Sequence, residues 1–253
     1  MADTPSPAVT YGSYLKLDEL LALQQPRSEG PEHDEMLFIV IHQIYELWFK
    51  ELLHEFDHVR VLLEDDESHR AQHLLKRILT ILKVMVGQID VLETMTPLEF
   101  LSFRSRLEAA SGFQSDQFRQ IEFVLGHKSE EAARRFPEGS RARQALEQRF
   151  SQPTLWDGFV RYLAREGYPV PPAQAIQSTL IDVYRRDPKN AELCERLVDL
   201  DEGIQEWRYR HVKMVERTIG GRAGTGGSAG AGYLRGTLSR PLFPDLWEIR
   251  TQL

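Results

Sequence analysis

Apolar residues recur every three or four positions along three long stretches of this chain, residues 33–63, 67–92 and 188–219. That period places the apolar residues on one face of a helix, so each stretch predicts a helix that packs against other helices. The first stretch lacks internal proline and glycine and is apolar almost all around near its start, which is typical of a buried helix. No clear strand pattern and no internal repeat appear in the sequence.

Shorter elements separate the second and third stretches. Thr96 is followed by a proline and, three positions on, by a glutamate; this capping box predicts a helix that ends near Ala110. A further helix is expected from Ser115, with Gly126 just past its end. Residues 129–192 predict shorter helices, because proline and glycine interrupt them repeatedly.

The chain begins with ten small and proline-rich residues, which we expect to be loose. Residues 11–25 then predict a short amphipathic helix. Taken together, the helical patterns predict an all-α fold: one bundle-like domain over residues 1–253, built from long antiparallel helices.

Composition narrows the functional classes. The chain carries a formal net charge of −7, so it lacks the basic excess that nucleic-acid binding requires. The longest strongly apolar run, residues 36–41, is too short to span a bilayer, and residues 1–10 show no signal-peptide pattern. Cys194 is the single cysteine, which excludes an intrachain disulfide. We therefore expect a soluble, cytoplasmic protein that binds neither nucleic acid nor membrane.

His211 lies on the regular apolar stripe of residues 188–219. It follows Trp207 by four positions and precedes Met214 by three, so all three side chains share one helix face. A histidine in such a place is commonly a hydrogen-bonded core residue. The functional interpretation is an axial ligand of a haem iron, since a helix holds an imidazole rigidly and an apolar interior suits a porphyrin. Spacing alone leaves both interpretations open.

His42 is the only basic residue in a very apolar segment of the first long stretch. Phe38 lies one turn before it, and Glu46, one turn after it, is a possible hydrogen-bond partner. A polar group this deep needs a partner, and that partner is either such a carboxylate or a bound ligand.

Arg104 and a glycine-rich loop are two further candidates. Arg104 follows Phe100 by one turn and has Phe103 beside it, and a guanidinium among aromatic rings can clamp a carboxylate. A surface arginine is the plainer interpretation. The loop at 220–232 is rich in glycine, which lets backbone N–H groups approach a ligand, and Thr225 and Ser228 add hydroxyl groups. A flexible linker has the same composition.

Two histidine pairs have a spacing of four, His54 with His58 and His69 with His73. This spacing can hold a metal. Glu51 precedes His54 by three positions, as in half of a di-iron carboxylate site, but a second such motif is missing. Solvated helix faces explain these residues better.

The sequence as a whole resembles the tryptophan 2,3-dioxygenase family. Matching blocks lie in the family's order at both ends of the chain, at residues 11–18, 33–50, 92–100, 103–107, 111–115 and 207–220, followed by Gly-Thr-Gly-Gly-Ser at 224–228. Residues 128–190 match only loosely, so no role is carried over there.

The resemblance implies roles for the polar candidates. His211 is similar to the family's proximal haem ligand and His42 to the distal histidine beside the indole N–H. Arg104 resembles the residue that pairs with the carboxylate of the amino acid, and Thr225 resembles the contact to its ammonium and carboxylate end.

The resemblance also implies an apolar pocket and an oligomer. The implied indole wall comprises Phe38, Phe100, Phe103 and Leu107, and the implied haem contacts are Ser111 and Gly112. Many family members carry a tyrosine at the position of Phe100, so any hydrogen bond of that hydroxyl is absent here. Tyr11 and Tyr14 resemble residues that reach into a neighbouring subunit of a homotetramer, which gives residues 11–25 a partner surface.

The activity that the resemblance implies is cleavage of the indole C2–C3 bond of L-tryptophan. Haem b is the implied cofactor, O₂ the co-substrate and N-formylkynurenine the product, as in the first step of the kynurenine pathway. Two alternatives remain: a related haem enzyme acting on another indole, and a non-enzymatic haem-binding bundle. An indole without an amino-acid end would have no use for Arg104 or Thr225.

Overall fold

The structure is a computed structural model that describes residues 8–170, 176–226 and 230–253. All regular secondary structure in these residues is helical and no strand occurs among them, which confirms the predicted all-α class. The expectation of a loose start concerns mainly residues 1–7, which lie outside the described residues, as does Ser228 of the glycine-rich loop.

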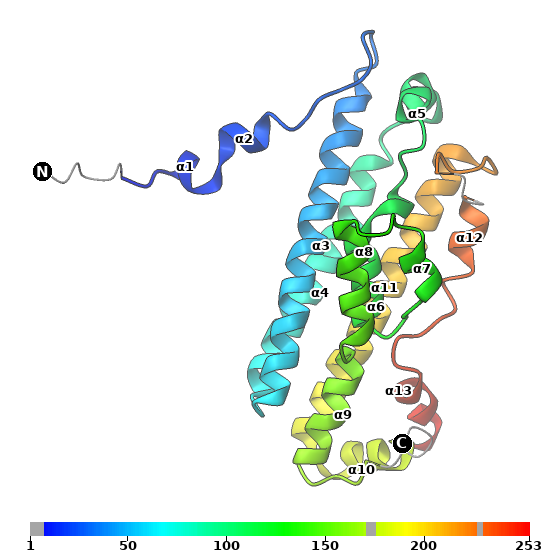
Figure 1. The fold of residues 1–253 in the computed structure, drawn as a ribbon. Coiled ribbons are helices and arrows are strands. Elements are labelled where there is room, and N and C mark those ends of the chain that lie inside the picture. The colour runs from blue at the N-terminus through cyan, green and yellow to red at the C-terminus, as the bar shows by residue number, and fades with distance from the viewer. Residues whose placement is uncertain (1–7, 171–175, 227–229) are drawn as a thin grey trace, which may run out of the picture.

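Three long helices form the body of the molecule (Figure 1). They are α3 (Asp34–Glu64), α4 (Ser68–Leu92) and α11 (Pro188–Ile219), and they coincide with the three predicted stretches to within a residue. A short turn joins α3 to α4, which makes these two helices antiparallel. The pairs Gln72–Lys189 and Asp90–Arg210 join α4 to α11 in the same order along both helices, so α4 and α11 run parallel.

The buried core lies between these three helices. The α11 stripe faces inward as predicted, and its leucines are at most 1% exposed. The side chains that meet there share complete or nearly complete burial: Phe56, Leu75, Ile78, Leu82, Leu193, Leu197 and Leu200. Each such side chain contributes about 1.5–3 kcal/mol relative to an exposed one, so the core strongly fixes the helix faces.

Shorter helices surround this core. Packed on α3 are α6 and α9; α8 packs on α6, and α10 and α12 pack on α11. Their bounds are α6 (Asp116–Val124), α7 (Glu130–Arg134), α8 (Arg141–Ser151), α9 (Leu155–Arg165), α10 (Ile176–Arg186), α12 (Ala231–Arg235) and α13 (Pro244–Glu248). None of the described helices is long and apolar enough to cross a membrane.

The helix that begins after Thr96 is shorter than predicted. Its capping box is confirmed, because the Thr96 hydroxyl accepts from the Glu99 N–H and the Glu99 carboxylate accepts from the Thr96 N–H. However, α5 ends at Arg104 and continues as a 3₁₀ turn, η1 (Ser105–Leu107). Glu108 then takes φ +49°, a conformation that costs a residue with a side chain about 1 kcal/mol or more, so the α-helix cannot continue to Ala110.

The N-terminal residues form an arm that stands away from the bundle (Figure 1). Residues 11–25 are not one helix as predicted, because Lys16 takes a left-handed φ of 54° and divides them into α1 (Tyr11–Leu15) and α2 (Leu17–Leu21). The base of the arm is fixed to the bundle, since the buried carboxylate of Glu35 accepts hydrogen bonds from two backbone N–H groups of the preceding loop.

The C-terminal segment is attached to α11 by one buried carboxylate. Asp201 is fully buried, and its Oδ2 accepts from the backbone N–H groups of Leu242 and Phe243 and from Trp247 Nε1. Its other oxygen accepts from Gln205, one turn along the helix. Four donors therefore satisfy this charge, and they hold residues 242–247 against the helix that carries His211.

Candidate active site

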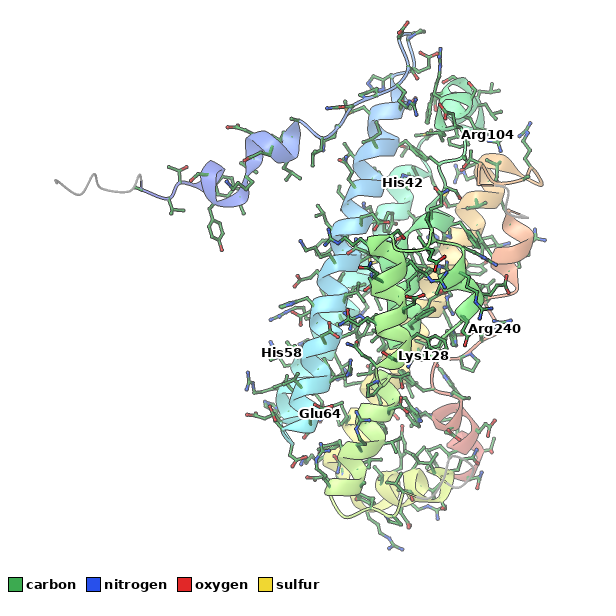
Figure 2. The ribbon with its side chains drawn as sticks, in the orientation of Figure 1. His42, His58, Glu64, Arg104, Lys128 and Arg240 are labelled. Atoms are coloured by element: carbon green, nitrogen blue, oxygen red, sulfur yellow. The ribbon has the colours of Figure 1, made fainter. Side chains whose placement is uncertain are left out.

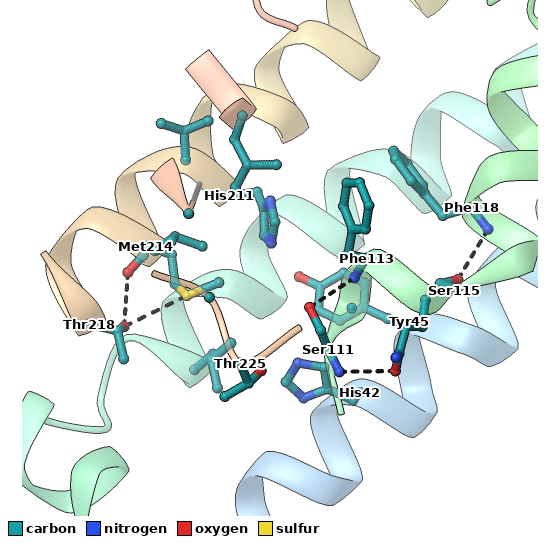
Figure 3. A pocket seen from close by; sticks show the side chains of 18 of the residues that line it. His42, Tyr45, Ser111, Phe113, Ser115, Phe118, His211, Met214, Thr218 and Thr225 are labelled. Carbon is teal, nitrogen blue, oxygen red and sulfur yellow. Dashed lines mark hydrogen bonds between the residues drawn. The ribbon is translucent and has the colours of Figure 1, made fainter. Parts of the chain in front are cut away.

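A large cavity lies between the long helices and the segment that follows α5. Its volume is about 610 Å³, within the roughly 300–1,000 Å³ of pockets that hold organic ligands. Helices α3, α4, α6 and α11 supply most of its wall, and α5, residues 107–115, the glycine-rich loop and α12 contribute further residues. Figure 3 shows His42 on α3 and His211 on α11 projecting into this space.

His211 faces the cavity from the apolar stripe of α11. Its ring stacks parallel to that of Trp207, with the centroids 5.4 Å apart and the planes at 3°. No hydrogen bond joins the ring to another described residue. Burial, and then the nearby His42, lower the pKa of His211 to about 4, so the imidazole is neutral at pH 7. The structure thus presents a neutral, unpartnered imidazole, which is the state in which histidine binds a metal.

His42 makes one hydrogen bond, and that bond fixes the role of each ring nitrogen. Nδ1 lies 2.7 Å from the backbone carbonyl oxygen of Phe38, which can only accept, so Nδ1 carries the proton. Burial lowers the pKa of His42, although the Phe38 carbonyl and the Glu46 charge oppose that effect, so the ring is neutral at pH 7. Nε2 is consequently a free acceptor. The carboxylate of Glu46 is not its partner, because that group accepts from Gln117 instead.

Aromatic rings form the wall beside His42. The ring of Phe38 lies 4.0 Å from that of His42 and 5.8 Å from that of Phe100, both measured between centroids. Phe38, Phe100 and Leu107 line the cavity, as the resemblance implies. Phe103 is fully buried behind them, in edge-to-face contact with Phe38 and Phe100, so it supports the wall and does not line it.

Arg104 and Thr225 lie at one end of the cavity and join the glycine-rich loop to the segment after α5. Arg104 Nη2 donates to the carbonyl oxygen of Ala223 at 2.6 Å, while its Nε is buried without a partner. The Thr225 hydroxyl donates to the carbonyl oxygen of Ala110 at 2.5 Å. The structure thus brings together two residues that are 121 positions apart, and both line the cavity.

The same contact includes one glycine that no other residue could replace without movement. A Cβ atom on Gly226 would lie 2.7 Å from the Cβ of Ser111. Ser111 and Gly112 line the cavity at this point, and the Ser111 hydroxyl accepts from the Phe113 N–H. Position 226 therefore requires glycine because the backbone there packs directly on the Ser111 side chain.

Tyr11 and Tyr14 are not brought to the cavity of their own chain. Each is 77% exposed on the arm. The paired histidines are also elsewhere: all four, including His54 beside Glu51, are exposed on α3 and α4. Figure 2 shows His58 far along α3 from His42 and Arg104. No group of three or more metal-ligating side chains is present among the described residues, so nothing supports a di-iron site.

Sequence reasoning missed four charged residues on the cavity wall: Asp116, Arg119, Glu122 and Arg208. Arg208 had a signal, since it precedes His211 by three positions and shares its helix face. Arg119 and Glu122 had none, because only the packing of α6 against α3 and α11 turns them toward the same cavity.

This geometry defines a class: an all-α protein with a cavity between its long helices, lined by two neutral imidazoles and bordered by a glycine-rich loop that Arg104 binds. Comparison with known proteins then identifies the family. The tryptophan 2,3-dioxygenase model matches residues 2–155 and 160–253. The chain belongs to the tryptophan 2,3-dioxygenase family.

Relatives of that name cover almost the whole chain. The tryptophan 2,3-dioxygenase of Herpetosiphon aurantiacus is 58% identical, over 98% of this chain and 100% of its own. That of Anaeromyxobacter sp. strain K is 56% identical, over 98% and 97%. That of Caulobacter vibrioides is 44% identical, over 97% and 98%. The match therefore includes the arm, the cavity and the C-terminal segment.

Proposed function

We propose that this chain is a haem-dependent dioxygenase that inserts both atoms of O₂ across the indole C2–C3 bond of L-tryptophan and yields N-formylkynurenine. The observation that carries the proposal is the pair of imidazoles in one apolar cavity. The His211 ring makes no hydrogen bond within the described part of the chain, and His42 has its single free nitrogen, Nε2, available as an acceptor.

The residues of the cavity fit a haem. A neutral imidazole on a rigid helix is a suitable axial ligand, and the stacked ring of Trp207 fixes its orientation. The apolar surface around it, from Ile89, Leu92 and Val212 among others, suits a porphyrin face. His211 would hold the iron, with Ser111 and Gly112 at the cavity edge. Bound haem supplies the binding and activation of O₂.

The remaining site residues bind and orient the amino acid. The guanidinium of Arg104 pairs with the substrate carboxylate, using donors that the Ala223 carbonyl leaves free. Thr225, which is held against Ala110, contacts the same end of the substrate. The indole lies against Phe38, Phe100 and Leu107, where apolar contact excludes water.

His42 fixes the orientation of the indole ring. Its Nδ1–H is committed to the Phe38 carbonyl, so Nε2 accepts a hydrogen bond from the indole N–H. Together with the Arg104 contact, this bond holds the substrate at two separated points, which positions C2 and C3 for reaction. The positioned amino-acid end also favours tryptophan over other indoles.

The arm offers a surface on which a second copy of this chain can pack. Tyr11, Tyr14, Leu21 and Leu23 are each more than 60% exposed, and none of the residues that the structure describes covers them. In the proposed homotetramer, the arm of one subunit packs on the next, and Tyr11 and Tyr14 border the neighbouring active site. An exposed apolar patch of this kind is typical of an assembly surface.

Anaerobic reduction followed by the addition of tryptophan and O₂ tests the proposed function. We expect a Soret band, a stoichiometric pyridine haemochrome, and absorbance growth of the formylated product. A colourless, haem-free yet active enzyme would refute the role of His211. A haem-bound protein that forms no product from tryptophan would support the non-enzymatic bundle instead.

A further inference from the structure

A second pocket lies outside the candidate active site, between α3, α6 and α8, and we call it the α3–α8 pocket. Its volume is about 330 Å³, near the lower end of the range for pockets that hold organic ligands. Asp57 and Arg60 line it from α3, and Arg149 lines it from α8. Asp57 follows His42 by 15 positions, about 22 Å along the axis of α3, so the two sites are separate. Figure 2 shows Glu64, which also lines this pocket, near the opposite end of α3 from His42.

One arginine of the pocket is paired at two points. Both carboxylate oxygens of Asp57 accept from Arg149, Oδ1 from Nη1 and Oδ2 from Nη2, the latter at 2.6 Å. Arg149 Nη1 also donates to the side-chain oxygen of Gln152 at 3.3 Å. This bidentate pair joins α8 to α3, and the shortest contacts of the Asp57 carboxylate therefore go to Arg149.

Arg60 is the arginine that this arrangement leaves without a hydrogen bond. Its side chain is only 16% exposed, and its Nε is buried without a partner. Nη1 lies 3.7 Å from Asp57 Oδ1, which is beyond hydrogen-bond distance. No hydrogen bond joins this guanidinium to any other residue that the structure describes. A guanidinium has five N–H donors, and buried donors without acceptors cost free energy, so an acceptor that enters the pocket would be bound favourably.

The surroundings hold the Arg60 side chain in place and add polar groups. A Cβ atom on Gly158 would lie 3.7 Å from Arg60 Cγ, so the stem of the arginine packs on the backbone of α9. Gln148 and Gln152 of α8 line the same pocket with side-chain amides, which can both donate and accept. A fixed guanidinium beside amide groups is a suitable arrangement for binding a polar molecule.

The charge and the composition of the lining favour a small anion. Glu64 pairs with Arg161 of α9 at 3.4 Å, which leaves Asp57 as the one carboxylate opposite two arginines. Positive charge is therefore in excess within the pocket. Among the described residues that line it, Val61 and Ala145 are the apolar ones and none is aromatic, so a flat apolar group finds little surface there.

We propose that the α3–α8 pocket binds a small polar molecule through an oxyanion group, a carboxylate or a phosphate, that pairs with Arg60. The guanidinium supplies parallel N–H donors to two oxygens of that group. Arg149 adds positive charge, and the amides of Gln148 and Gln152 bind the polar remainder of the ligand. This site acts independently of the cavity that holds His42 and His211. Because the ligand binds only the folded chain, it raises the stability of that chain.

The first test uses the full-length protein without substitution. Succinate and inorganic phosphate are titrated separately by isothermal titration calorimetry, and succinamide, the uncharged diamide of succinate, is the control. We expect at least one anion to bind, and succinamide to bind at least about 10-fold more weakly than succinate if the carboxylate is the preferred group. Preference for succinate identifies a carboxylate ligand and preference for phosphate identifies a phosphate ligand. Absence of binding by both anions at millimolar concentration would overturn the proposal.

The second test locates the bound anion with matched variants. Arg60→Met removes the donors but keeps an unbranched stem beside α9, and it leaves the Arg149–Asp57 pair intact. Arg60→Lys keeps the charge alone. Arg196→Met is the control for charge, since it removes an equal charge from α11, outside the pocket. The affinity for the anion should fall at least about 10-fold in Arg60→Met, less in Arg60→Lys, and stay unchanged in Arg196→Met.

A further variant separates this site from the proposed active site. Arg104→Met removes the cation beside the glycine-rich loop, and it should leave the anion affinity unchanged. The anion should also raise the Tm of the unsubstituted protein and of Arg104→Met, but not that of Arg60→Met. Full anion affinity in Arg60→Met, or an equal loss in Arg60→Met and Arg196→Met, would show that Arg60 does not bind the oxyanion. Neither result bears on product formation from tryptophan, which is measured separately.

Discussion

The two sides of the cavity are built differently. On one side, His42 and His211 project from long helices whose inner faces pack in a continuous core. On the other side, the glycine-rich loop rests on residues 104–111 through two hydrogen bonds and the contact at Gly226. Substitutions on the helical side should therefore affect cofactor retention and stability, whereas those on the loop side should affect substrate affinity and leave the fold intact.

The largest effect is expected from His211→Ala. His211 is the only histidine of α11, so haem retention and turnover should be lost. Far-UV circular dichroism should still show a helical protein, because the core around α11 is unchanged. Haem content by pyridine haemochrome and product formation are the measurements, with the exposed His69→Ala as control. Near-normal turnover in His211→Ala would exclude it as the ligand.

Asp201→Ala should have the largest effect on stability. It leaves the buried N–H groups of Leu242 and Phe243, and the indole N–H of the partly exposed Trp247, without their acceptor, which should lower the free energy of unfolding by roughly 3–5 kcal/mol. Chemical denaturation measures this loss. Asp199→Ala is the control, because Asp199 is half exposed on the same helix. Equal stability of the two variants would show that Asp201 does not hold the C-terminal segment.

These helical features illustrate what sequence could predict. Periodicity located the three long helices to within a residue, because burial in one core imposes the period along the entire helix. It did not locate the break at Lys16, which one residue with positive φ decides, or the change from α-helix to 3₁₀ turn after Arg104, which leaves no mark in the apolar spacing. Asp201 was not recognised either, because its partners come from a segment about forty residues away.

On the loop side, Arg104→Ala should lower kcat/KM for tryptophan. The substrate carboxylate loses a charge-assisted partner worth about 1.5–3 kcal/mol, so kcat/KM should fall roughly 10- to 150-fold. Arg106→Ala is the matched control, two positions along and exposed. Steady-state kinetics and thermal melting should show lost kcat/KM with unchanged Tm. An unchanged kcat/KM for tryptophan would contradict the carboxylate role.

Gly226→Ala should have a smaller effect on the same side. The added Cβ meets the Cβ of Ser111 at 2.7 Å, so the loop must shift. A cost of about 1 kcal/mol corresponds to a roughly fivefold lower kcat/KM. Gly221→Ala is the control, since a Cβ there meets nothing within 4 Å. If both variants behave alike, the contact with Ser111 does not position the loop.

The site itself was only partly predictable from the pattern of residues. Helical spacing placed His211 and Trp207 on one face, and the structure confirms that face. It could not decide between Glu46 and a ligand for His42, because the actual partner is the Phe38 carbonyl, a backbone group that no residue pattern reveals. The meeting of Arg104 with Ala223 depends on tertiary packing between distant segments, so only resemblance pointed to that end of the cavity.

The smallest expected effect concerns pH, and it distinguishes a buried ligand from an exposed one. A histidine binds iron only when neutral, and an ordinary histidine becomes mostly protonated below its pKa of about 6.5. Burial and His42 lower the pKa of His211 to about 4, so proton competition for the ligand begins only well below pH 6. The unfolded chain protonates His211 near pH 6.5, whereas the folded chain does so only near pH 4. The free energy of unfolding therefore decreases as pH falls from about 6.5 toward 4. Soret absorbance should therefore change little between pH 7 and pH 5 while circular dichroism remains constant. Loss of haem with a midpoint near pH 6.5 from a folded protein would show that the His211 imidazole is not held in the water-poor environment of the helical side.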